Sequence, residues 1–357
     1  MATRASIVAA AKNVDLVFEG GGVKGIGLIG AYSVLEEHGY RPQNLAGTSA
    51  GAIVATLAAA GYTAAELRGL LLELDFGGLR DRAWEDKVPL IGVPLSILKD
   101  RGVYEGEALL AWLRERLEAK GVRTFRDLVH PDFAGDERYR YRVQVVASDL
   151  TARRLLVLPQ DARRLGIVPD DLDVALAVRM SSSVPFFFEP VRVPNRRTGR
   201  EHLIVDGGVL SNFPVWLFDV DGEPPWPTFG LLLVEPEPRT SLGERLPRRE
   251  PGEQRIGGVV DYAKSLIMTM LEAHDRLYVE KADFARTIPI ETLGVRTTEF
   301  GLARRRALAL YESGRRAAEQ FLAGWDFDGY VAEFRRGKEH SRREELAADM
   351  RLAARGP

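Results

Sequence analysis

The residues best suited to catalysis include a serine that lies two positions from a glycine on each side. They form a G-x-S-x-G pattern made of Gly47, Thr48, Ser49, Ala50 and Gly51. In a nucleophile elbow, this pattern puts the serine hydroxyl on a sharp turn between a strand and a helix. The glycines remove side chains that would clash where the two elements meet. The pattern therefore predicts Ser49 as a nucleophile.

A carboxylate far downstream offers the base that a serine nucleophile needs. Asp206 follows the short apolar run Leu203–Val205 and precedes Gly207 and Gly208. A carboxylate at the end of a strand, next to two glycines, is well placed to reach a serine at a neighbouring strand end. We therefore predict Asp206 as the base.

A glycine-rich loop near the start of the chain could stabilise negative charge. It lies between an apolar strand pattern over 15–18 and a helical pattern over 26–38, and it consists of Gly20, Gly21, Gly22, Val23, Lys24 and Gly25. Glycines let backbone N–H groups turn toward one point, and the start of a helix favours an anion there. The loop is a candidate oxyanion hole.

In this order, the three motifs resemble the patatin-like phospholipase family, and the likeness runs from about Val14 to about Leu233. The resemblance implies a lipid acyl hydrolase with a Ser–Asp dyad and no catalytic histidine. Ser49 then corresponds to the nucleophile and Asp206 to the base. The family's oxyanion hole falls on Gly21, Gly22 and Val23, next to Lys24. The implied fold is α/β, a three-layer α/β/α arrangement with a mostly parallel central sheet, plus C-terminal helices.

Apolar periodicity indicates the elements that must position these residues. The expected strands cover 15–18, 44–46, 139–149, 155–158, 203–205, 228–234 and 288–290. The expected helices cover 26–38, 50–60, 64–74, 107–119, 173–180, 256–281 and 302–323. Strands that alternate with helices are typical of a parallel sheet, in which the carboxyl ends of neighbouring strands meet at one edge.

Shifts in composition divide the chain into segments. We expect an N-terminal extension over 1–13, a catalytic core over 14–235, a flexible charged and proline-rich loop over 236–258, a helical part packed on the core over 259–325, and a charged tail over 326–357. Within the core, the apolar stretch 88–103 is interrupted by prolines and a glycine. It is either a buried crossover or a cap over an acyl-chain cleft.

An aromatic segment next to the predicted base has two readings. It follows three serines and consists of Pro185, Phe186, Phe187 and Phe188. Its rings either pack in the core or line a pocket for an acyl chain.

Other chemistries fit the motifs less well. A Ser-His-Asp esterase needs a histidine in a late strand-end loop, and none of the five histidines has that position. The glycine loop also satisfies G-x-G-x-x-G, but the acidic residue expected on the second strand of a dinucleotide fold is replaced by Asn44-Leu45-Ala46. A lipid- or acyl-binding module without catalysis stays open as an alternative.

Composition narrows the remaining possibilities. The 357 residues carry a formal net charge of -2, so we expect no nucleic-acid partner. The absence of cysteine excludes disulfides, thiolate zinc sites and a cysteine nucleophile. Neither a metal nor an organic cofactor is expected. With no signal-peptide pattern, we expect a cytoplasmic protein that acts on a lipid or acyl-ester substrate, either in solution or at the surface of a membrane. Nothing in the sequence indicates an oligomeric state.

Overall fold

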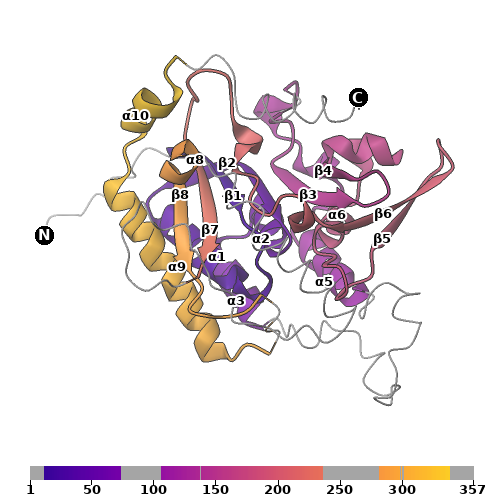
Figure 1. Ribbon diagram of the computed structural model, residues 1–357, viewed down its shortest axis with the longest axis horizontal. Helices are drawn as coiled ribbons and strands as arrows, with labels where there is room; N and C mark the ends of the chain where they lie inside the picture. Colours follow the sequence, from indigo (N-terminus) through magenta and orange to yellow (C-terminus); the bar gives the residue numbers. More distant parts are fainter. Residues whose placement is uncertain are drawn as a thin grey trace, which may run out of the picture.

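One mixed, eight-stranded sheet organises the described part of this computed structural model (Figure 1). The structure describes residues 12–73, 106–136, 138–235, 281–297, 299 and 301–337. The strand order is β5-β6-β3-β2-β1-β7-β8, and β4 pairs with the free edge of β3. The prediction of an α/β fold with a mostly parallel sheet and C-terminal helices is confirmed.

The centre of the sheet is parallel. Its strands are β1 (Lys12–Phe18), β2 (Tyr40–Thr48), β3 (Val143–Asp149), β7 (Thr228–Val234) and β8 (Thr287–Glu291). Their buried positions are dominated by valine, leucine and isoleucine, as expected for strands that are covered on both faces. The carboxyl ends of β1 and β2 therefore lie at one edge, where the glycine loop and the elbow begin.

Three antiparallel strands extend the sheet beyond β3. They are β4 (Arg154–Leu158), β5 (Val191–Asn195) and β6 (Arg200–Asp206). Because β4 occupies one edge of β3, the strands β2 and β6 must share the other edge. On that edge, β2 pairs with 143–146 and β6 pairs with 147–149. The carboxyl ends of β2 and β6 therefore abut, with Thr48 opposite Val146 and Asp206 opposite Ala147.

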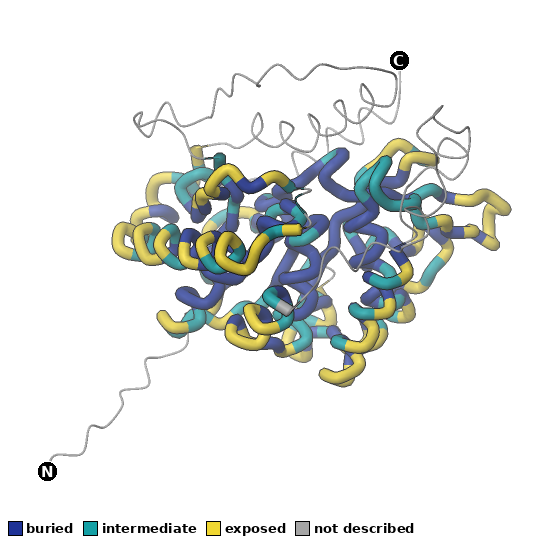
Figure 2. Tube along the Cα trace, turned by 90° about the horizontal axis from the view of Figure 1, so that it is seen from below, coloured by how far each residue is buried: buried dark blue, intermediate teal, exposed yellow. Residues whose placement is uncertain are grey.

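Most helices contribute to the larger hydrophobic core on one face of the sheet. They are α1 (Gly25–Glu37), α2 (Ala50–Ala59), α3 (Ala64–Glu73), α5 (Glu107–Glu118), α6 (Val174–Ser181) and α9 (Arg304–Gly324). Alternate residues of the strands, such as Leu16 and Phe18 of β1, point into this core. Figure 2 shows the buried residues gathered at the centre and the exposed ones along the outer helices.

The opposite face of the sheet carries a smaller, partly aromatic cluster. Val17, Ala46 and Val146 of the three central strands meet Leu217 and Phe218 of a 3-10 helix, Val215–Phe218. The period of two along each strand thus separates the two cores cleanly. Within the described residues, this face is covered by short turns and 3-10 segments.

The C-terminal elements surround β8, the last strand at one edge of the sheet. The short helix α8 (Lys281–Ala285) leads into β8, and α10 (Phe327–Tyr330) follows α9 and continues as a π-helical turn, Val331–Arg335. Arg286 is buried and bonds Asp219 and Asp283, each at 2.6 Å. Arg335 is also buried and lies 3.8 Å from Asp219. The first residues of the segment 326–357, which the sequence predicts as a charged tail, therefore pack near Asp219 in the catalytic core.

Several strands begin at other residues than the sequence predicts, and pairing across the sheet explains the two clearest cases. β2 begins at Tyr40 because its polar first residues pair with β1 from Lys12 onward. β3 begins at Val143 and not at Tyr139, since Tyr139–Arg142 form a turn that bridges to Val129. The predicted segments 88–103 and 236–258, and nearly all of the helix expected over 256–281, lie outside the described residues. The domain boundaries stay predictions.

Candidate active site

Ser49 occupies the sharp turn between β2 and α2. Its backbone has φ 53° and ψ -125°, a left-handed conformation that residues other than glycine rarely adopt. A Cβ at Gly47 would lie 2.4 Å from the carbonyl of Gly51, and one at Gly51 would lie 2.3 Å from the Phe18 carbonyl oxygen. Strand and helix approach so closely that only glycine fits at both positions. The elbow geometry expected from the sequence is present.

Two serines, Ser181 at the end of α6 and Ser183 just beyond it, fix the elbow and the predicted base. Ser181 Oγ accepts the Ser49 N–H at 2.9 Å and donates to the Val146 carbonyl at 2.6 Å. The Ser183 carbonyl accepts the Asp206 N–H at 2.9 Å. Both serines are buried. Sequence reasoning identified small residues here but assigned them no such bonds, because a serine hydroxyl in a buried loop has no distinctive pattern.

Asp206 lies at the end of β6, where β6 abuts β2. Its side chain is fully buried, and Oδ1 accepts the Gly208 N–H at 2.8 Å. Oδ2 is buried and has no hydrogen-bond partner of good geometry among the described residues. Burial raises the pKa of Asp206 to about 7, and the nearby Ser49 hydroxyl and the Gly208 N–H each lower it in part. The structure thus brings the two predicted catalytic residues together.

The turn after Asp206 rests on the end of the elbow strand. A Cβ at Gly207 would lie 2.3 Å from the Val146 carbonyl oxygen and 2.9 Å from Thr48 Cγ2. The Thr48 hydroxyl in turn donates to the Ser211 carbonyl at 3.2 Å. These contacts hold the carboxylate-bearing turn at a fixed position relative to the elbow.

Asn212 joins the glycine loop to the Asp206 turn. Its side-chain Nδ2 donates to the Gly20 carbonyl at 3.0 Å, and its backbone carbonyl accepts the Gly20 N–H at 3.1 Å. A Cβ at Gly20 would lie 3.2 Å from Ser49 Cβ. The glycine loop therefore lies directly against the candidate nucleophile. The two bonds from Asn212 fix the position of the loop relative to the segment that follows Asp206.

The amides of the glycine loop divide into two groups. The N–H groups of Gly21 and Gly22 donate to no acceptor among the described residues, whereas the Val23 N–H donates to the Thr297 carbonyl at 3.3 Å. The expectation that Val23 donates to an oxyanion is therefore not met in this structure, since its N–H is already bonded. Thr297 lies in the loop between β8 and α9, far outside the motifs, and no signal in the sequence connects it to this site.

The starts of two helices converge beside Ser49. α1 begins at Gly25 and α2 begins at Ala50, and a Cβ at Gly25 would lie 3.4 Å from Ala50 Cβ. Both helix dipoles therefore favour negative charge at this position. Lys24 is largely buried, and its Nζ lies 4.0 Å from Glu235 Oε1. The surroundings suit an anion that develops next to the serine hydroxyl.

The phenylalanines next to the site are half-buried. Pro185, Phe186, Phe187 and Phe188 form a turn after α6, and neither hydrophobic cluster includes them. The guanidinium of the buried Arg179 lies 5.5 Å from the centre of the Phe188 ring. Whether they line an acyl pocket or pack in the core stays a prediction.

The histidines in the described residues have other contacts. His38 lies 2.9 Å from the Val34 carbonyl at the end of α1, and His202 lies 2.7 Å from Asp149. His130 accepts the Asp132 N–H at 3.2 Å. None of these three is bonded to Ser49. In the described ranges, no three histidine or carboxylate side chains lie close enough together to hold a metal ion.

None of the helices in the described part of the chain combines the length and the apolar composition that crossing a membrane requires.

Comparisons with known proteins agree with this geometry. The family model of patatin-like phospholipases matches residues 16–219. YqhO of Bacillus subtilis is 39% identical over 315 residues, which cover 88% of this chain and 99% of YqhO. The probable lipid hydrolase 463L of invertebrate iridescent virus 6 is 24% identical over 56% of this chain and 61% of that protein. The crystal structure of VipD from Legionella pneumophila shares the fold, with a TM-score of 0.51 and 19% identity over 88% of this chain and 67% of VipD.

Proposed function

Because the chain belongs to the patatin-like phospholipase family, we propose that it is a lipid acyl hydrolase that works through a Ser49–Asp206 dyad. The observation that carries this proposal is the meeting of a strained serine and a fully buried carboxylate at two abutting strand ends. Ser49 is 8% exposed and Asp206 is fully buried, so the carboxylate lies in surroundings that raise its basicity.

In the first step, Asp206 accepts the proton of the Ser49 hydroxyl as Ser49 Oγ attacks the acyl carbonyl carbon. A carboxylate with an ordinary pKa is a weak base, whereas a pKa of about 7 matches a base that works near neutral pH. Burial raises the pKa of Asp206 because it disfavours the charged form of the carboxyl group.

Negative charge then develops on the carbonyl oxygen and needs donors that are already in place. The N–H groups of Gly21 and Gly22 are available, and the Ala50 N–H at the start of α2 is a third candidate. Loss of one such donor typically costs about 3 kcal/mol of transition-state stabilisation. The Thr297 carbonyl holds the loop through Val23 and supports the orientation of the two glycine amides.

The second half of the reaction reverses these roles. The C–O bond of the ester breaks, the alcohol or lysolipid leaves with the proton from Asp206, and an acyl–Ser49 ester remains. Water then gives a proton to Asp206 as its oxygen bonds to the acyl carbon. The bond between the acyl carbon and Ser49 Oγ breaks, Ser49 Oγ takes the proton back from Asp206, and the fatty acid is released. No further reactant is needed.

The substrate class follows from the family and from the apolar surroundings. A relative is named a probable lipid hydrolase, and half-buried phenylalanines lie on the segment that holds Ser181 and Ser183. We propose that Phe186–Phe188 contact the acyl chain of a phospholipase A or lysophospholipase type of ester substrate.

Hydrolysis of a nitrophenyl acyl ester tests the dyad. Ser49→Ala and Asp206→Asn should each lower kcat by at least about a thousand-fold, because each removes one half of the unit that forms the acyl-enzyme. Asp328→Asn, at an exposed position on α10, is the matched control and should keep full activity. Retained activity in either dyad variant would exclude this mechanism, and a wild-type protein without any esterase activity would favour a lipid-binding module.

A further inference from the structure

A basic projection extends from the edge of the sheet at which Ser49 lies. It consists of two segments, 150–154 between β3 and β4 and the β5–β6 hairpin over 192–201. Because β3 runs parallel to β2, the chain leaves β3 at the same edge as the elbow leaves β2. β6 extends from Arg200 to Asp206, so the hairpin tip lies about 20 Å from the predicted base along the strand. Figure 1 shows the β5–β6 hairpin projecting outward from the sheet.

Hydrogen bonds hold the two segments of the basic projection side by side. The Leu150 N–H donates to the Leu203 carbonyl at 2.9 Å, and the Thr151 hydroxyl accepts the Leu203 N–H at 3.0 Å. The same hydroxyl donates to the Glu201 carbonyl at 3.4 Å. The turn after β3 therefore rests on the first half of β6, and the two segments form one surface.

The charge of the basic projection is strongly one-sided. Its only carboxylate is Glu201, which pairs with Arg192 at 3.0 Å. Five more arginines are exposed, and their side chains have no hydrogen-bond or ion-pair partner among the described residues; they are Arg153, Arg154, Arg196, Arg197 and Arg200. Since the whole chain has a formal net charge of -2, this excess of positive charge is local.

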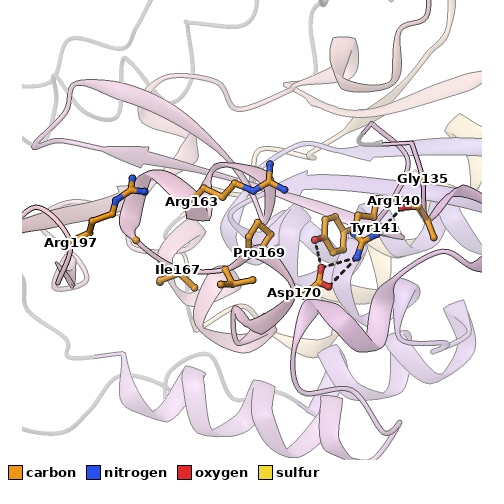
Figure 3. Close-up of a pocket in the computed structure, with 11 residues that line it drawn as sticks. Gly135, Arg140, Tyr141, Arg163, Ile167, Pro169, Asp170 and Arg197 are labelled. Atoms are coloured by element: carbon orange, nitrogen blue, oxygen red, sulfur yellow. Dashed lines mark hydrogen bonds and ion pairs between the residues drawn. The ribbon is translucent and has the colours of Figure 1, made fainter.

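A neighbouring carboxylate does not neutralise the hairpin tip. Arg197 lines an open pocket together with Asp170, and Figure 3 shows the two side chains at opposite ends of the view. Asp170 bonds Arg140 at 3.0 Å and 3.2 Å, so its charge is balanced there. The buried Asn195 fixes the backbone of the tip, because its Oδ1 accepts the Arg197 N–H at 3.1 Å.

The chemistry of the basic projection fits an anionic lipid surface. Each arginine near such a surface adds to the attraction, and an exposed apolar side chain beside the arginines gains by entering the lipid–water interface. Leu150, which is 46% exposed, has that position. A nucleic acid fits less well, because the two segments contain no aromatic side chain on which a base could stack.

We propose that the basic projection docks the protein on a membrane of acidic phospholipids, with Leu150 at the interface. The orientation rests on the proposed function, in which a lipid ester reaches Ser49 from the same edge of the sheet. The docking itself depends on the unpaired arginines and not on the catalytic residues.

Co-sedimentation of the full chain with vesicles of diether phospholipids tests the proposal. These lipids have no carboxylic ester, so binding is measured whether or not the proposed hydrolysis occurs. Diether phosphatidylcholine vesicles with about 30% diether phosphatidylglycerol should bind the wild type at least about ten-fold more tightly than phosphatidylcholine alone. Raising NaCl from about 0.1 M to about 0.5 M should remove most of this difference, because salt screens exposed charges.

Two double variants with the same change of charge locate the surface. Arg196→Gln with Arg197→Gln should weaken binding to the acidic vesicles by about ten-fold, since two arginines near the lipid are lost. Arg41→Gln with Arg316→Gln is the matched control, at exposed positions at the start of β2 and on α9. The control should bind within about two-fold of the wild type, because these charges lie away from the proposed contact and are screened.

Hydrolysis of a soluble nitrophenyl ester separates this proposal from the proposed function. Both double variants should keep the wild-type rate, since the reaction needs no membrane. Equal weakening of vesicle binding in the two double variants, or no preference for acidic vesicles, would overturn the docking and leave the hydrolase proposal intact. Binding of a DNA duplex that exceeds binding to the acidic vesicles at the same salt would also overturn it, in favour of a nucleic-acid surface. A wild type that binds acidic vesicles through Arg196 and Arg197 but hydrolyses no ester would support the docking and contradict the proposed function alone.

Discussion

Ser49 shows how a single residue is held in a conformation that its side chain disfavours. Its positive φ places Cβ against the backbone, which costs on the order of 1 to 3 kcal/mol for a residue other than glycine. The close approach of Gly47 and Gly51 and the bond from Ser49 N–H to Ser181 hold it there. The strain belongs to the elbow and should persist when only the hydroxyl is removed.

A comparison of Ser49→Gly with Ser49→Ala measures that strain. Both variants lose the hydroxyl, but only glycine relaxes at this φ, so Ser49→Gly should be more stable than Ser49→Ala by about 1 kcal/mol in urea unfolding. At Ser33, inside α1, the same pair should have the opposite order, because glycine is the poorer helix former. If Ser49→Ala were at least as stable as Ser49→Gly, as expected at Ser33, the elbow would be unstrained.

The pKa of Asp206 sets the expected pH dependence of the reaction. The base must be deprotonated, and burial raises its pKa to about 7, so kcat/KM should be maximal above about pH 7. Below that value it should fall about ten-fold for each pH unit, as the carboxyl group takes up a proton. Initial rates with an uncharged ester from about pH 5 to about pH 9 provide the measurement. A profile that is flat down to about pH 5 would mean that Asp206 keeps an ordinary pKa or is not the base.

At the scale of single residues, the sequence located the candidate catalytic groups but not the residues that support them. Ser49 and Asp206 could be selected as candidates because their two short glycine motifs follow the glycine loop in a specific order. The structure shows that the Asn212 side chain, a few residues after the Asp206 turn, donates to the Gly20 carbonyl of the glycine loop. Thr297 was not predictable, because its contribution is a backbone carbonyl that any residue could supply.

Among the elements, α9 has the closest contact with the helix that follows the glycine loop. A Cβ at Gly314 would lie 1.9 Å from the Gly27 carbonyl oxygen, and one at Gly30 would lie 1.9 Å from the Tyr311 carbonyl oxygen. α1 and α9 thus cross backbone to backbone (Figure 1). Because α1 begins at Gly25, directly after the loop, its position against α9 also sets the position of the candidate oxyanion donors.

Gly314→Ala tests the importance of this crossing. The added methyl group must push the two backbones apart, so the variant should lose about 1 to 3 kcal/mol of stability in chemical denaturation. Gly69→Ala, on α3, makes the same change where no atom of the described residues outside the helix's own backbone lies within 4 Å of the added Cβ, and it should be neutral or slightly stabilising. If Gly314→Ala were as stable as Gly69→Ala, the close crossing would not exist in solution.

Helices and strands with a clear periodicity of apolar residues were predictable from the sequence. Elements that form only because another element pairs with them were less predictable. The strand Thr228–Val234 and the helix near Arg304–Gly324 follow their apolar patterns closely. The polar start of β2 is a strand only because β1 pairs with it. The sharing of one β3 edge by β2 and β6, which brings Ser49 to Asp206, is a property of the sheet that no local pattern contains.

On the scale of the whole molecule, the site depends on parts that the family match does not include. The match ends at residue 219, whereas β7 pairs with β1 at the centre of the sheet and the β8–α9 loop bonds the glycine loop. The catalytic proposal therefore concerns the folded chain and not the motifs alone.

Covalent labelling with a fluorophosphonate, located by peptide mass spectrometry, tests the central claim most directly. A serine becomes reactive toward this probe only when a base and oxyanion donors surround it. We expect one adduct, on Ser49, with loss of labelling in Ser49→Ala and much slower labelling in Asp206→Asn. No adduct on Ser49 in the folded protein, or labelling that is unchanged by Asp206→Asn, would contradict the proposed dyad.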